Sequence, residues 1–105
     1  MNPERVQQIR AMMAEDPGDP FCKYALALEY GSDESMKDKA LELLKELILQ
    51  HPAYLPAYYQ LALHLRAKGE IAASGKVVQA GMQLAKAQNN KHTFAELEFL
   101  LEELE

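Results

Sequence analysis

The stretch Tyr24-Ala25-Leu26-Ala27-Leu28 returns 35 residues later as Tyr59-Gln60-Leu61-Ala62-Leu63, and this repetition decides the fold. The same offset places Pro17 on Pro52. It also superposes two apolar series, with Val6, Ile9, Met12 and Met13 falling on Leu41, Leu44, Leu47 and Ile48. An offset of 34 then brings Ala40, Leu44 and Ile48 onto Ser74, Val78 and Met82. Repeats of this length indicate supersecondary units that stack side by side.

The spacing of the apolar residues predicts helices throughout the chain. Val6, Ile9 and Met13 recur at i, i+3 and i+7, which is one face of a helix. No segment alternates with period two, so we expect no sheet. The Pro and Gly positions place helices at about 3–15, 20–30, 36–50, 56–68, 70–88 and 93–104. Their short connections predict an all-α array of about six antiparallel helices.

Several helix ends carry recognisable signals. Asn2 before Pro3 is typical of an N-cap followed by the first helical residue, and Gly69 suits a C-terminal stop. Two further starts look like capping boxes, in which Ser or Thr precedes an acidic residue by three: Ser35 with Asp38, and Thr93 with Glu96.

The composition is that of an ordinary globular protein. In 105 residues, 49% are hydrophobic and 26% are charged. The formal charge of −5 argues against nucleic-acid binding, which depends on Lys and Arg. The one cysteine, Cys22, excludes an internal disulfide and is expected to be an inert buried thiol. No apolar run approaches the roughly 20 residues of a membrane span, and the N-terminus lacks a signal-peptide pattern, so we expect no membrane partner and a cytoplasmic location.

Signs of catalysis are absent. The three histidines, His51, His64 and His92, are not spaced for a metal site on one helix. No glycine-rich phosphate loop is present. We therefore predict no catalytic residue, no metal, no cofactor and no enzyme activity.

The repeat resembles the tetratricopeptide repeat (TPR), a helix-turn-helix unit of 34 residues. The first unit fits its pattern with Leu26, Ala27, Tyr30, Ala40, Leu44 and Pro52, and the second with Tyr58, Leu61, Ala62, Leu65, Ser74 and Val78. Two residues depart from the pattern: Lys23 stands at the Trp position and Lys86 at the second closing Pro. The turn Asp16-Pro17-Gly18-Asp19-Pro20 is similar to one in small stand-alone bacterial members of this family.

The resemblance implies a single domain over 1–105, a TPR-like solenoid of two full repeats, 20–50 and 53–88, between two half-repeats. Residues 3–15 resemble the second half of a repeat whose first half is missing. Residues 93–104 resemble a first half without its partner, and their acidic outer face suits a terminal cap. Small residues are expected where paired helices approach closely: Ala27, Ala40, Ala62, Ser74 and Gly81.

The resemblance also implies a function and a surface. In the family, one face of each repeat's first helix lines a concave groove that binds peptides. The residues placed there are Phe21, Tyr24, Leu28, Tyr59, Leu63 and Arg66. The chain is thus expected to be an adaptor or scaffold that binds a peptide or protein segment. The Lys and Asn clamp that grips acidic chaperone tails is missing, so we predict no binding of such tails.

Other fates for this apolar face stay open at this point. The last helix could cover it through Phe94, Leu97 and Leu101. A second copy could bury it, which would make the protein a structural homodimer, and a small-molecule pocket is a further alternative. Met12, Met13 and Met82 are expected to fill gaps in the core.

Overall fold

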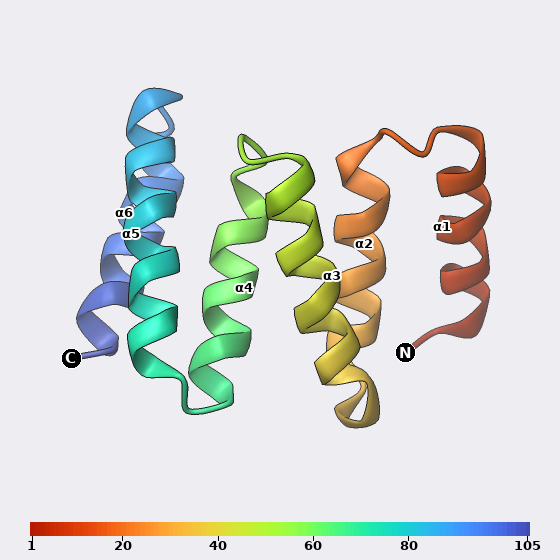
Figure 1. The fold of residues 1–105 in the computed structure, drawn as a ribbon, viewed down its shortest axis with the longest axis horizontal. Helices are drawn as coiled ribbons and strands as arrows, with labels where there is room; N and C mark the ends of the chain where they lie inside the picture. The colour runs from red at the N-terminus through yellow and green to blue at the C-terminus, as the bar shows by residue number, and fades with distance from the viewer. The chain divides into compact units, whose positions relative to one another are not determined.

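The computed structural model describes residues 1–105 and consists of six α-helices with no strand, which confirms the predicted all-α fold. The helices are α1 (Pro3–Glu15), α2 (Pro20–Gly31), α3 (Lys37–Gln50), α4 (Pro56–Ala67), α5 (Ile71–Ala87) and α6 (Lys91–Glu103), and a short 3₁₀ turn, η1 (Glu34–Met36), precedes α3. The chain forms two compact units, Met1–Pro52 and Ala53–Glu105. Within each unit, consecutive helices run antiparallel (Figure 1).

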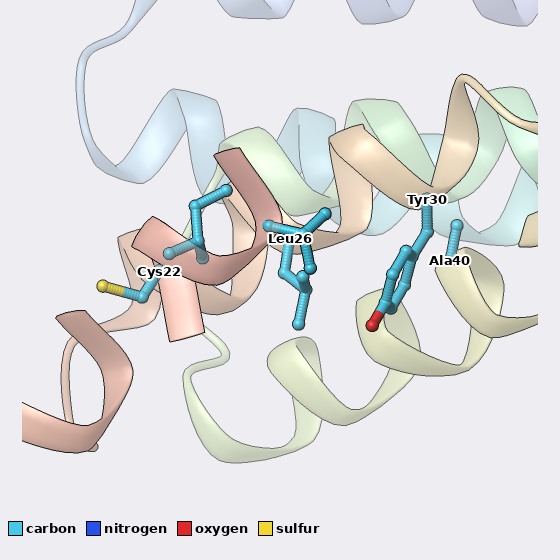
Figure 2. Close-up of a cluster of buried hydrophobic side chains, with 6 residues drawn as sticks. Cys22, Leu26, Tyr30 and Ala40 are labelled. Atoms are coloured by element: carbon cyan, nitrogen blue, oxygen red, sulfur yellow. The ribbon is translucent and has the colours of Figure 1, made fainter. Parts of the chain in front are cut away.

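The first unit packs α2 against both α1 and α3. Its core cluster consists of Val6, Ile9, Cys22, Leu26, Tyr30 and Ala40. Cys22, Leu26 and Tyr30 follow one another along a single stripe of α2 (Figure 2). The Arg10 guanidinium donates a hydrogen bond to the Tyr30 hydroxyl, so the polar end of this ring is satisfied.

The second unit packs α5 against both α4 and α6. Its core cluster consists of Leu55, Ala62, Val78, Ala85, Leu97 and Leu100. The buried Ser74 hydroxyl donates to the Ala62 carbonyl oxygen at 2.8 Å, which joins α5 to α4. A Cβ at Gly81 would lie 3.0 Å from both Leu97 Cδ1 and Tyr58 Cβ, so only glycine fits there without displacement.

The small residues that we expect at close approaches between helices are all buried. Ala27, Ala40, Ala62 and Ser74 are at most 1% exposed, and Gly81 is buried. Two predicted helix ends, the start of α1 and the end of α4, are also confirmed. The Asn2 side chain accepts from the Glu4 and Arg5 amides, and Gly69 ends α4 with φ +83°.

Both predicted capping boxes are wrong. Before α3, the Asp33 carboxylate accepts from the Ser35 amide and hydroxyl, at 3.0 and 2.8 Å, and caps η1. These bonds, the hydroxyl bond above all, hold the pKa of Asp33 below its usual range. Ser35 therefore lies inside the first turn instead of before it.

The start of α6 differs in the same way. The Asn90 side chain accepts from the Thr93 amide at 3.0 Å, so α6 begins at Lys91, two residues earlier than predicted. Asp and Asn are at least as good N-caps as Ser and better than Thr, which explains why they prevail at both starts.

Candidate functional site

A groove runs between α1 and α2 in the first unit, with a volume of about 420 Å³. We call it the α1–α2 groove; it is lined by Arg5, Gln8, Ile9 and Met12 from α1 and by Phe21, Cys22, Ala25, Leu28, Glu29 and Ser32 from α2. Ile9 and Cys22 are buried in its floor. Met12, Phe21 and Leu28 are 50%, 48% and 42% exposed, so they present large apolar side chains to water. Such a contiguous apolar rim is typical of interaction sites.

An ion pair lies at the end of the groove where α1 begins and α2 ends. Arg5 Nη1 lies 3.1 Å from Glu29 Oε1, and the Asn2 amide donates to Glu29 Oε2 at 3.2 Å. The Glu29 carboxylate is therefore satisfied by the protein itself. Arg5 is 64% exposed, so the pair adds little to stability but fixes a polar boundary.

Two carboxylates lie near the opposite end of the groove, where the chain passes from α1 to α2. Asp19 caps α2 by accepting from the Phe21 amide at 2.9 Å, and the Asp19 amide donates to the Asp16 carbonyl. Burial, together with the negative charges of Asp19 and Asp16, raises the pKa of the Cys22 thiol. A thiol held protonated is a poor nucleophile, so Cys22 serves as apolar wall.

Two of the predicted site residues, Phe21 and Leu28, thus meet in the α1–α2 groove. Tyr24, from the same helix, is half-buried and does not line it. Met12 does line it and is 50% exposed, so the prediction that Met12 fills a gap in the core is wrong. The repeat offers a signal that could have found it: Met12 corresponds to Gly81, a position that faces Tyr58 of α4 and Leu97 of α6.

The other predicted site residues lie together on α4 in the second unit. Tyr59 and Leu63 are half-buried and pack against the same core cluster as Phe94 and Leu101 of α6. Arg66 Nη1 lies 3.7 Å from Glu103 Oε2, which ties α4 to α6. The last helix thus shares the packing surface of these α4 residues, and it leaves them less open than Phe21 and Leu28.

No group of three or more His, Cys, Asp or Glu side chains is placed to hold a metal ion. His92 lies 3.5 Å from Glu96, one helical turn away on the exposed face of α6. No helix has the length and apolar character needed to cross a membrane.

Comparison with known proteins gives a fold relationship. No protein-family model matches the sequence, and no curated protein matches it. A solved structure of a tetratricopeptide repeat domain protein from Salinibacter ruber is similar, with a TM-score of 0.80 and 28% identity over 86% of this chain and 90% of that one. A protein from Bordetella parapertussis has the same fold, with a TM-score of 0.79 and 23% identity over 94% of this chain and 85% of that one.

Proposed function

This chain is a small tetratricopeptide-repeat-like protein, and we propose that it works as a non-catalytic protein-interaction module, an adaptor or scaffold that binds a segment of another protein. The fold supports this role because stacked helical hairpins offer extended surfaces and few enclosed pockets. We also propose a bacterial, cytoplasmic setting. The relative from Salinibacter ruber is bacterial, and a lone thiol such as Cys22 suits a reducing compartment.

The observation that carries the proposal is the apolar rim of the α1–α2 groove. Met12, Phe21 and Leu28 are each close to half exposed and line the same hollow. Aromatic and Met side chains are enriched in the buried centres of protein interfaces. Covering these three side chains would remove apolar surface from water, which is the main favourable term in association.

The face of α4 is a second contributor in this proposal. Tyr59, Leu63 and Arg66 keep part of their surface accessible, and Arg66 forms an ion pair with Glu103, whose side chain is 48% exposed. Tyr24 remains a candidate contact on α2. We give these four residues a supporting part, since each is already partly engaged within the protein.

Affinity capture from the source cells tests the proposal. The bait is compared with a Phe21→Ala plus Leu28→Ala variant, and Phe99→Ala is the control because Phe99 is 65% exposed on α6 and does not line the groove. We expect the double variant to lose bound partners and the control to retain them. Tyr24→Ala plus Tyr59→Ala measures the supporting contacts. Equal recovery by wild type and the Phe21, Leu28 variant would contradict the proposed site.

A further inference from the structure

In the second unit, α4 lies over the pair of helices formed by α5 and α6. α4 packs against α5, and both α4 and α6 contribute side chains to one core cluster. Position 81 of α5 faces the junction of the two, because a Cβ there would meet both Tyr58 of α4 and Leu97 of α6. The Arg66–Glu103 pair joins the last turns of α4 and α6. These two helices therefore run in the same direction (Figure 1).

In the first unit, α1 and α2 form a pair like α5 and α6, but no helix lies over them as α4 lies over α5 and α6. The repeat offsets relate Ile9 to Val78 and Met12 to Gly81, so α1 corresponds to α5, and α2 follows α1 as α6 follows α5. Val78 is fully buried and Gly81 is buried, whereas Met12 is 50% exposed. The α1–α2 groove is thus the place that α4 occupies on α5 and α6.

We propose that the α1–α2 groove binds an amphipathic α-helix of another protein, oriented parallel to α2, with an apolar face and a cationic first turn. This inference rests on the proposed function and names the kind of segment that is bound. The helix would complete the N-terminal half-repeat in the way that α4 completes the arrangement in the second unit.

The dimensions fit a short helix. Phe21 and Leu28 are seven residues apart on α2, which corresponds to two helical turns, about 10 Å. An incoming helix presents side chains at i, i+3 or i+4, and i+7 over the same length. The volume of about 420 Å³ lies in the range of small binding pockets and suits a few apolar side chains.

The charges around the groove select the partner. Arg5 and Glu29 neutralise each other at one end, whereas the Asp16 and Asp19 carboxylates lie near the other, where their negative charges act on Cys22. A helix parallel to α2 begins at this second end, so its positive N-terminus and a Lys or Arg in its first turn would meet these carboxylates. A second copy is a poor occupant because each copy carries a net charge of −5.

Fluorescence anisotropy with three labelled 14-residue peptides tests the inference. The first has leucines on one helical face and two lysines in its first turn; the second replaces those lysines by glutamates; the third places a proline at the centre. We expect the first to bind and the other two to bind about tenfold more weakly, since a central proline breaks the helix and the glutamates face Asp16 and Asp19.

Protein variants locate the site. Phe21→Ala and Met12→Ala are expected to weaken binding of the first peptide by about fivefold or more. Phe99→Ala and Leu49→Ala, at exposed apolar positions outside the groove, are expected to bind as wild type does. Circular dichroism checks that each variant keeps its helical content, and a groove variant that has lost it is replaced by Leu28→Ala.

The outcomes separate this inference from the proposed function. The inference of a helical ligand is overturned if the first peptide fails to bind, if the proline or glutamate peptide binds equally well, or if Phe21→Ala leaves the affinity unchanged. A groove-dependent dimer in sedimentation would also overturn it, because the occupant would then be a second copy. Should cellular capture still depend on Phe21 and Leu28, the interaction module would stand while the helical ligand would be abandoned.

Discussion

The two units use the same helical hairpin chemistry but differ in how completely α1 and α5 are enclosed. α5 packs against a helix on each side, and its Ser74 and Val78 are fully buried. α1 packs against α2, and its innermost residues, Val6 and Ile9, remain 8% and 6% exposed. The difference teaches that a helix packed on one side only leaves an apolar face, and that this face is where binding surface can be found.

The same difference predicts unequal rigidity. Segments with few buried apolar contacts open most readily under native conditions. We therefore expect the amides of α1 to exchange with solvent faster than those of α5 and α6, and a ligand in the α1–α2 groove to slow the exchange of α1 most.

The largest expected effect comes from truncating the two cores. Leu97→Ala removes a fully buried side chain that α4, α5 and α6 surround, and it should lower the free energy of unfolding by about 3–5 kcal/mol. Ile9→Ala, at the floor of the open groove, should cost about 2 kcal/mol because its surroundings can relax. Urea denaturation measures both, with Leu49→Ala as the exposed control. Equal losses for Leu97 and Ile9 would contradict the comparison.

A smaller effect is expected from enlarging equivalent positions. Gly81→Leu forces side-chain atoms into Tyr58 and Leu97 and should destabilise the protein by about 1–3 kcal/mol. Met12→Leu, at the corresponding site of α1, should change stability by less than about 0.5 kcal/mol because the side chain already reaches water.

Gly75 provides the internal control for this pair. A Cβ at Gly75 meets nothing within 4 Å, so Gly75→Ala should raise stability by up to about 1 kcal/mol through helix propensity alone. Thermal melts compare all three variants. If Gly81→Leu were as stable as wild type, the tight contact of α5 with its neighbours would be refuted.

The smallest effect concerns pH. The folded state raises the pKa of the Cys22 thiol through burial first and then through Asp19 and Asp16. Above about pH 8.5, the usual thiol pKa, the unfolded chain loses this proton while the folded chain retains it. The thiol therefore contributes fully at lower pH, and stability should decline as the pH rises. Denaturation at pH 7.5 and 9.5 should show a smaller decline for Cys22→Ala, and an identical decline would refute the assignment.

Much of the fold could be predicted from the Pro and Gly positions and the apolar spacing, whereas the caps before α3 and α6 could not. Asn2, Pro3 and Gly69 act locally, so their effect is legible in sequence. In both places the capping side chain comes earlier in the chain than the predicted one: Asp33 accepts the Ser35 amide at the start of η1, and Asn90 accepts the Thr93 amide at the start of α6.

The candidate surface was harder to predict because the exposure of a helix face depends on which other helices cover it. Phe21 and Leu28 remain open on α2, while Tyr59 and Leu63 pack toward the core that α6 shares. Helical periodicity assigns each residue to a face, but it does not say whether another helix covers that face. Met12 escaped prediction for this reason.

The rate at which the Cys22 thiol in the floor of the groove is alkylated reports on movement between α1 and α2. Cys22 is 2% exposed, so an alkylating reagent can reach it only when α1 moves away from α2. A ligand that clamps the two helices together would lengthen the alkylation half-time. Occupancy of the groove could then be followed by mass spectrometry on the unlabelled, unmutated chain.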